Sequence, residues 1–408
     1  MERTDIFAAA LKLEHRVSSI RQDLLPQMHV LTLTPFYPTA ADDASGCFIA
    51  ESVGELQRKG VESSAIVVYP IYRAYPGPDS KAPPAVAKKY VCIPGNAGLS
   101  SAGNFLYAAL KHEVRRLHSG RPISLIHAHA ALPCGQAAML LARDLGIPFV
   151  VTVHGLDVFS TRQVPGWLGR RRAAVCRNVY AAADRVICIS ERVAQGVRDR
   201  LEESANISVV YNGVDAALFA PGPGDYLPRP VILSVGNLIR IKGHELLLRA
   251  VAAIASSHPQ LECRIIGDGL ERARLQGLAR ELRVEDRIRF MGRRSRAEVA
   301  QAMRECTVFA LPSSYEGLGC VYLEAMSAER PTIGCRGQGI DEVIRHAENG
   351  WLIQPKDLGE LTSALQRLLA DRNLRENIGR AGRRTILEGF TLAHQAERLV
   401  SIYGDCIA

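Results

Sequence analysis

Two glutamates, Glu316 and Glu324, carry the strongest chemical signal in this sequence. An apolar run just before Glu316 predicts a buried strand, and a helical pattern begins near Leu318. A helix N-terminus attracts anions through its unpaired N–H groups, and Gly317 and Gly319 let the backbone approach a phosphate closely. Eight helical residues rise roughly 12 Å, so the two carboxylates suit an elongated ligand with a diphosphate in its middle. The alternative is a loop before an amphipathic helix whose glutamates are solvated.

A basic loop follows another predicted strand in the second half of the chain. The strand ends at Gly236, and the loop that starts with Asn237 contains Arg240 and Lys242. A lysine provides a point charge and an arginine a planar fork, and both groups bind phosphate. The loop therefore predicts phosphate contacts, and the alternative is a basic loop in solvent.

Three histidines in the first half of the chain lie at the ends of two predicted strands. His127 and His129 end one strand, and His154 follows another, with Asp157 close behind it. Such a group can hold a metal ion, but a His-x-His pair at a strand end is more often hydrogen-bonded structure, and we predict no metal. Gly46 stands just ahead of the first predicted helix and belongs to a further candidate loop.

Strands, loops and helices alternate in two successive blocks, which is typical of parallel, doubly wound sheets whose ligands bind beyond the carboxyl ends of the strands. The predicted strands are 28–33, 65–69, 123–126, 149–153, 184–190 and 209–211 in the first block, and 231–236, 263–266, 308–311, 331–335 and 349–353 in the second. Residues 70–94 are expected to be irregular, and 337–343 to open a helix. We predict an α/β protein with four parts: an N-terminal extension (1–27), a first Rossmann-like domain (28–218), a second one (219–389) and a C-terminal helix (390–408) that completes the first.

The composition indicates a globular protein whose partners are acidic. The 408 residues are 47% hydrophobic and 23% charged, with a formal net charge of +8, and no apolar run approaches the 18 or so residues of a membrane span. Positive charge favours phosphorylated small molecules and anionic lipid surfaces, whereas no nucleic-acid motif is present. Ten cysteines scattered singly predict reduced thiols. The N-terminus has no signal-peptide pattern, so we expect a cytoplasmic protein.

The segment 311–326 resembles the Glu-x7-Glu motif of retaining glycosyltransferases of family 4, in a Pro-Ser-x-x-Glu-Gly-x-Gly context. The resemblance covers roughly residues 28–408. It implies that Glu316 contacts the donor sugar, that Glu324 contacts the ribose of the nucleotide, and that the amides between them bind the diphosphate. The residues implied for the diphosphate are Gly317, Leu318 and Gly319.

Other motifs resemble the same family in the same order. The loop after Gly236 resembles Gly-Arg-Leu-x-x-x-Lys-Gly, in which the Arg and the Lys hold the diphosphate; Asn237 stands at the Arg position, and we expect Arg240 to replace it. Val153-His154-Gly155 resembles a Thr-x-His-Gly stretch whose histidine faces the transferred sugar. We therefore expect His154, Glu316 and Lys242 to be catalytic. The resemblance also implies donor contacts for Gly46 and Asn212 and acceptor-side positions for His127, His129 and Asp157.

The resemblance implies the GT-B fold, with two facing Rossmann-like domains and the site between them. The implied reaction is transfer of a sugar from a nucleotide sugar, with a UDP-sugar expected, to a glycan or lipid-linked acceptor with retention of configuration. No metal or other cofactor is expected. The sequence is most similar to bacterial enzymes of cell-surface polysaccharide synthesis, of the teichuronic-acid type. The alternatives are a nucleotide-sugar epimerase of the same fold and a nucleotide-binding protein without transferase activity.

A tryptophan beside a basic cluster suggests contact with an anionic membrane. Trp167 precedes Arg170, Arg171 and Arg172, and each basic residue contributes on the order of 1 kcal/mol near such a surface. This arrangement would place the protein at the inner face of the plasma membrane, as suits a lipid-linked acceptor. The alternative is a solvated basic helix whose tryptophan packs inward.

Overall fold

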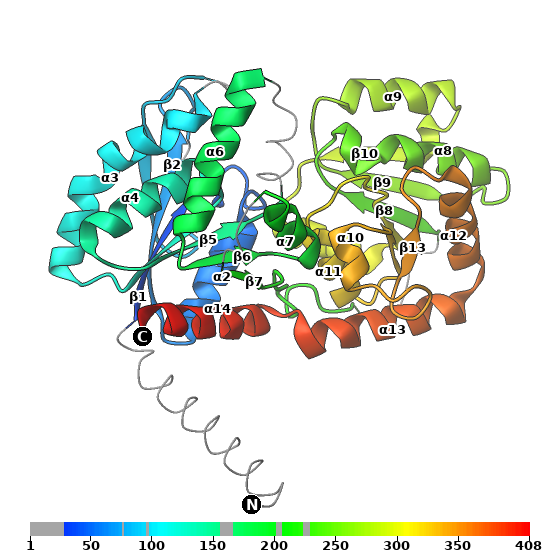
Figure 1. Cartoon of the computed structure of the whole chain (residues 1–408). Coiled ribbons are helices and arrows are strands. Elements are labelled where there is room, and N and C mark those ends of the chain that lie inside the picture. Colours follow the sequence, from blue (N-terminus) through cyan, green and yellow to red (C-terminus); the bar gives the residue numbers. More distant parts are fainter. Residues whose placement is uncertain (1–27, 76, 95–97, 156–165, 201–205, 223–228) are drawn as a thin grey trace, which may run out of the picture.

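The computed structural model describes residues 28–75, 77–94, 98–155, 166–200, 206–222 and 229–408. The predicted extension 1–27, Asp157 and the linker residues 223–228 lie outside this part of the chain. The described residues form two α/β units that lie side by side (Figure 1).

Each unit contains one parallel sheet. The first sheet has the strand order β3-β2-β1-β4-β5-β6-β7 and the second the order β10-β9-β8-β11-β12-β13. The first strands are β1 (His29–Thr34), β2 (Glu62–Pro70), β3 (Ala85–Tyr90), β4 (Leu125–His129), β5 (Phe149–Val153), β6 (Arg185–Cys188) and β7 (Ile207–Val209). The second set is β8 (Val231–Val235), β9 (Glu262–Ile266), β10 (Ile288–Gly292), β11 (Val308–Ala310), β12 (Thr332–Cys335) and β13 (Trp351–Ile353). Both orders start near the middle and step outward in each direction, as in doubly wound sheets, so the predicted fold class is confirmed.

Helices cover both faces of each sheet, which explains why β1, β5 and β8 are buried along their whole length. The helices of the first unit are α2 (Cys47–Arg58), α3 (Leu99–Gly120), α4 (Gln136–Leu145), α6 (Gly166–Ala182) and α7 (Glu191–Arg198). Those that follow are α8 (His244–Ile254), α9 (Arg272–Glu281), α10 (Arg296–Glu305), α11 (Cys320–Ser327), α12 (Leu358–Ala370), α13 (Arg372–Gly389) and α14 (Leu392–Ile407).

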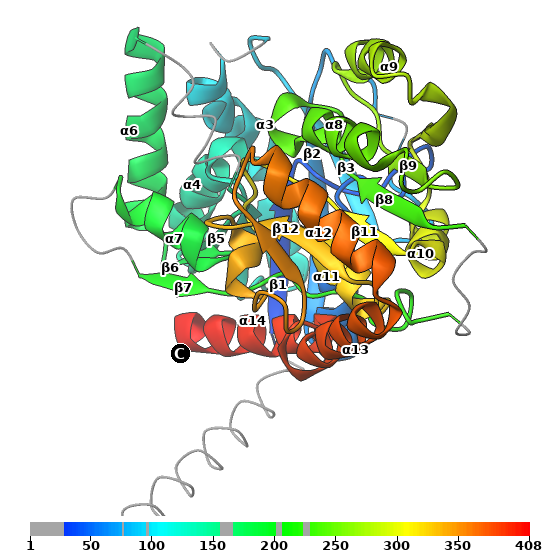
Figure 2. The same cartoon turned by 90° about the vertical axis from the view of Figure 1, so that its right-hand side faces the viewer.

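The last two helices connect the units. Figures 1 and 2 show α13 and α14 in succession along the same side of the molecule, with α13 beneath the second unit and α14 beneath the first. Leu399 and Tyr403 of α14 pack in one apolar cluster with Val30 and Leu125 of the first sheet. The chain therefore ends on the unit where it began.

Two local predictions are wrong. Residues 70–94, expected to be irregular, contain β3, which pairs with β2 at the edge of the sheet. The side chains of an edge strand are only partly buried, so its apolar signal is weak among the surrounding prolines. The helix expected at 337–343 is only a short 3₁₀ turn, η5 (Gly339–Glu342).

Candidate active site

Lys242 and Glu316 form an ion pair between two loops of the second unit. Lys242 Nζ lies 2.5 Å from Glu316 Oε2, and the side chains are 19% and 13% exposed. Lys242 ends the 3₁₀ turn η3 (Arg240–Lys242), and Gly243 follows with a positive φ of 74°; a Cβ at Gly243 would lie 2.1 Å from the carbonyl oxygen of Pro312. This close approach of the two loops brings the predicted phosphate-binding cation to the predicted sugar-binding carboxylate.

The loop after Glu316 leads into α11, and hydrogen bonds to residues 338 and 339 fix its backbone. Gly319, at φ 83°, is the N-cap of α11. Gly339 N donates to Glu316 O at 3.1 Å, and Glu316 N donates to Gln338 Oε1 at 3.1 Å. Within the part of the chain that the structure describes, the N–H groups of residues 317–319 donate to no protein acceptor. Three adjacent donors at a helix N-terminus suit a diphosphate.

The two units touch at this loop. Ser190 Oγ donates to Gly317 O at 2.6 Å, and the Tyr315 hydroxyl donates to Gly155 O at 2.8 Å. Ser190 is also the N-cap of α7, where it accepts from Val193 N at 3.2 Å. The turn after β5 therefore lies directly against the candidate diphosphate loop.

The three predicted histidines lie together behind that turn. His129 Nδ1 lies 3.0 Å from His154 Nε2, whereas both ring nitrogens of His127 are taken, by the Tyr403 hydroxyl at 2.6 Å and Thr152 Oγ1 at 2.7 Å. Burial lowers the pKa of His154 to about 4 and that of His127 to about 3, and it holds the pKa of His129 well below its usual value. All three rings are therefore neutral near pH 7. His154 is half-buried at the turn. The two hydrogen bonds of His127 favour a structural role for that residue, and the acceptor-side role of His127 stays a prediction.

Glu324 lies on α11, and it is 3% exposed. Its Oε1 accepts a hydrogen bond from Arg296 of α10, and among the described residues its Oε2 has no partner. The sequence prediction did not include Arg296, because an arginine at the start of a helix carries no local sign of a partner on another helix.

Other predicted donor residues surround the same region, but Arg240 does not join them. Gly46 has φ 68°, and a Cβ there would lie 2.4 Å from Tyr37 N. Asn212 Nδ2 lies 3.4 Å from Cys320 Sγ at the start of α11. Gly236 lies near the Lys242 side chain, whereas Asn237 is exposed. The Arg240 side chain is 83% exposed and its Nε lies 3.6 Å from Glu271 Oε1, so its expected contact with the diphosphate stays a prediction.

A second residue that sequence reasoning missed is Glu342, on η5. Its carboxylate accepts from Glu191 N at 2.7 Å, from Arg192 N at 2.8 Å and from the Tyr211 hydroxyl at 2.9 Å. A carboxylate at the N-terminus of α7 is stabilised by the helix dipole. Glu342 of the second unit therefore forms hydrogen bonds with three residues of the first unit beside the site.

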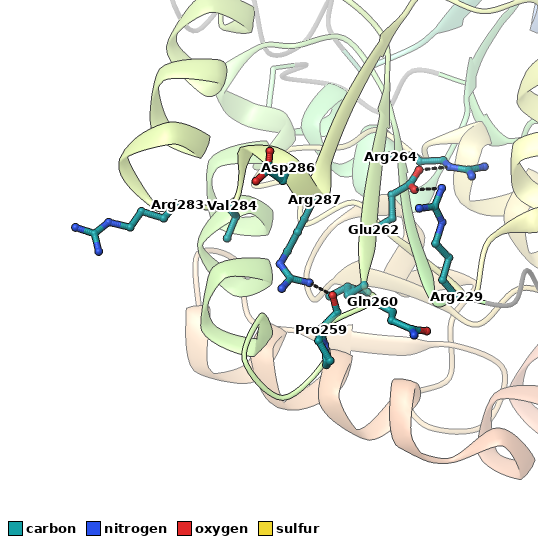
Figure 3. A pocket seen from close by; sticks show the side chains of 10 residues that line it. Arg229, Pro259, Gln260, Glu262, Arg264, Arg283, Val284, Asp286 and Arg287 are labelled. Atoms are coloured by element: carbon teal, nitrogen blue, oxygen red, sulfur yellow. Dashed lines mark hydrogen bonds and ion pairs between the residues drawn. The ribbon is translucent and has the colours of Figure 1, made fainter.

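A hollow of about 720 Å³ lies elsewhere, at the amino ends of β8, β9 and β10 (Figure 3). Its cations are largely engaged by protein groups. The Glu262 carboxylate pairs with Arg229 and Arg264, both at 2.7 Å, and Arg287 donates to backbone carbonyls. Ligands of doubly wound sheets bind at the opposite, carboxyl ends of the strands, so we assign this hollow no part in the site.

The predicted membrane cluster is only partly on the surface. Trp167 is 61% exposed, and Arg170 and Arg171 are exposed on α6. The prediction is wrong for Arg172, which is 6% exposed because it lies on the face of α6 that packs inward. In the described ranges, no helix has the length and apolar character needed to cross a bilayer, and no three His, Cys, Asp or Glu side chains are grouped as metal ligands.

Comparison with known proteins identifies the family. Residues 48–218 match the model for Glycosyltransferase Family 4, and residues 222–385 match the model for Glycosyl transferases group 1. A D-inositol 3-phosphate glycosyltransferase of Corynebacterium kroppenstedtii is 31% identical over 310 residues, which are 70% of this chain and 67% of that protein. The N-acetyl-alpha-D-glucosaminyl L-malate synthase of Bacillus anthracis is 26% identical over 305 residues, 72% of this chain and 77% of the relative.

Solved structures share the fold over nearly the whole chain. Sucrose-phosphate synthase from Thermosynechococcus elongatus superposes with a TM-score of 0.75 at 22% identity, covering 93% of this chain and 98% of that one. The Anabaena protein HepE in complex with UDP superposes with a TM-score of 0.72 at 19% identity, covering 93% and 100%. The two halves of the chain each form a Rossmann-like unit, and each half matches a glycosyltransferase family model. This chain therefore belongs to the family 4 type of glycosyltransferases with the GT-B fold.

Proposed function

We propose that the protein transfers a sugar from a UDP-sugar to a glycan or lipid-linked acceptor with retention of the anomeric configuration. The observation that carries the proposal is the 2.5 Å pair of Lys242 and Glu316 beside the amides of residues 317–319, which have no acceptor among the described residues. A cation and a helix N-terminus suit the diphosphate of a nucleotide sugar, and the carboxylate suits the hydroxyls of its sugar.

In the proposed reaction, the bond from the anomeric carbon to the phosphate oxygen breaks while the acceptor oxygen bonds to the same face of that carbon. Lys242 and the amides of residues 317–319 stabilise the negative charge that develops on the diphosphate. The acceptor proton passes to the leaving phosphate oxygen, so no covalent intermediate with the enzyme is required. Glu316 orients the sugar ring, and the neutral imidazole of His154 hydrogen-bonds to it. Because Lys242 and the dipole of α11 supply positive potential, the scheme requires no divalent cation.

The similar proteins support the choice of donor and of biological setting. Solved structures of HepE hold UDP, UDP with glucose, or UDP-glucose. Another similar structure is the lipopolysaccharide outer core galactosyltransferase WaaB, which has a TM-score of 0.64 at 18% identity and covers 93% of this chain and 99% of that one. These names favour a UDP-sugar donor and a role in cell-surface polysaccharide synthesis.

We also propose that the first unit rests on an anionic membrane while it acts. The exposed Trp167, with Arg170 and Arg171 on the same helix, presents an apolar group beside positive charge. Binding to vesicles that contain anionic lipid, measured by co-sedimentation, should weaken with salt and in the Trp167→Ser variant. Unchanged binding in that variant would remove this part of the proposal.

A panel of nucleotide sugars tests the central proposal. We expect release of UDP from one UDP-sugar, acceleration by a suitable acceptor, and activity that persists in EDTA. The Lys242→Met and Glu316→Gln variants should each lose on the order of a hundredfold or more in kcat, since a single preorganised charge contact contributes that much. Lys59→Met, which removes a surface pair with Glu397, is the matched control. Near-normal turnover in either site variant would contradict its assigned role, and NMR of the product gives the anomeric configuration.

A further inference from the structure

Arg296 connects three elements from both units. It is the first residue of α10, and its guanidinium donates to Glu324 Oε1 of α11 and, at 2.7 and 3.1 Å, to Glu51 Oε1 of α2. The Arg296 side chain is 12% exposed and lies over the ring of Phe219, with 4.7 Å from its guanidinium carbon to the ring centroid. One buried cation therefore joins a carboxylate of the first unit to the carboxylate predicted to bind ribose.

The second carboxylate oxygen of Glu324, Oε2, is left available to accept a hydrogen bond. Oε2 is buried and has no hydrogen-bond partner among the described residues, whereas Oε1 is engaged by Arg296. A buried carboxylate oxygen without a donor is unfavourable, so a donor from outside the protein is expected at this position. A ribose hydroxyl is such a donor.

The backbone of Arg296 and a neighbouring arginine also contact the first unit. The backbone N–H of Arg296 donates to the Asp43 carboxylate at 3.1 and 3.2 Å, and the neighbouring Arg293 pairs with Asp42. The segment 42–51, which begins in the loop after β1, thus holds the start of α10. If the units separate, these contacts break together, and Arg296 loses the groups that fix its position.

We propose that Arg296 is a positioning residue that fixes Glu324 for the donor ribose only when the two units are closed. Its bond to Oε1 sets the carboxylate orientation and leaves Oε2 for a ribose hydroxyl, while its bonds to Glu51 make that orientation depend on closure. The inference rests on the proposed function, because it takes a nucleotide as the ligand of Glu324. No other described side chain donates to Glu324 in place of Arg296.

The test compares UDP with 2′,3′-dideoxy-UDP by isothermal titration calorimetry. The wild type should bind UDP on the order of tenfold more tightly, as expected for a hydrogen bond to a charged group. In Arg296→Met the ratio of the two affinities should fall close to one, and Arg296→Lys should restore part of it. A structural role alone would weaken both ligands equally, so an unchanged ratio in Arg296→Met overturns the proposal.

Two further variants compare the contact of Arg296 with Glu51 and the neighbouring ion pair of Arg293 with Asp42. Glu51→Ala removes the acceptor that ties Arg296 to the first unit, so it should lower the preference for UDP towards that of Arg296→Met. Arg293→Met, which removes an ion pair between the units without touching Glu324, should keep the preference, because the bonds of Arg296 to Glu51 and Glu324 remain. If Arg296→Met does not fold by circular dichroism, Glu324→Gln takes its place and should show the same lost ratio.

The outcomes also separate this proposal from the proposed function. A wild type that binds no UDP and transfers no sugar contradicts the function. A wild type that transfers sugar but binds the two nucleotides equally contradicts only the role given to Glu324 and Arg296.

Discussion

The neutral histidines beside the site predict that the protein loses stability as the pH falls from 7 to 5. A histidine whose pKa falls from 6.5 to about 4 on folding, as for His154, binds fewer protons in the folded than in the unfolded state between these pH values. Its contribution therefore destabilises the fold by ~2 kcal/mol at pH 5 relative to pH 7. The pKa values of His127 and His129 are lowered by burial in the same direction, so both histidines add to this loss of stability.

Urea unfolding followed by circular dichroism at pH 7, 6 and 5 measures this loss. In the His154→Asn variant the difference between pH 7 and pH 5 should shrink by ~2 kcal/mol, whatever the variant does to stability at pH 7. His112→Asn, on an exposed position of α3, is the matched control and should keep the wild-type difference. If His154→Asn loses as much stability on acidification as the wild type, the imidazole is not held neutral by burial and the assigned chemistry of His154 is wrong.

Three further changes test the geometry around the site. Burial raises the pKa of Glu51, which faces Arg296, Glu324 and Asp215, to about 7. The folded state thus holds this proton more tightly than the unfolded state, and the wild type loses stability as the pH rises from 4.5 to 7. Over this range the unfolding free energy of Glu51→Gln, measured in urea, should rise by up to ~3 kcal/mol relative to that of the wild type. Gly46→Ala should lower the melting temperature more than Gly146→Ala, because both residues have positive φ but only Gly46 is packed against backbone; equal losses would show that the contact with Tyr37 is unimportant. Ser190→Ala should raise the donor KM severalfold through its lost bond to Gly317 O, whereas Asp371→Ala, which removes the N-cap of α13, should lower stability by ~1 kcal/mol and leave KM unchanged.

The sequence predicts the fold well where strands are buried on both faces. β5 matches its predicted bounds, and β8 ends one residue early, because apolar β-branched runs bounded by turns carry a strong local signal. β3 was missed because an edge strand lacks that signal, and η5 was predicted as a helix although its glycines favour a turn.

For the site, local patterns predict which residues bind but not which partners they have. Lys242 and Glu316 are far apart in the chain and meet as an ion pair, consistent with motifs that share one ligand. Arg240 lies in the predicted loop, yet its side chain points to solvent toward Glu271. Arg296 and Glu342 belong to no motif, and their roles arise only where the two units touch, which short-range sequence spacing does not report.

Contacts between the units include hydrogen bonds and ion pairs as well as apolar packing of Ile189 and Val193 with Leu318 and Ile340. Ser190, Tyr315, Arg296 and Glu342 each join the units by polar groups that water can replace when the units separate. Polar contacts of this kind contribute on the order of 1 kcal/mol each. A donor held by Lys242 on one side and by the turn at His154 on the other would bind the closed form selectively, and an affinity difference of about tenfold shifts the equilibrium by the same factor. Because the contacts of Ser190 with Gly317 and of Tyr315 with Gly155 lie at the candidate diphosphate loop or beside it, donor binding and closure would reinforce each other in the proposed transfer.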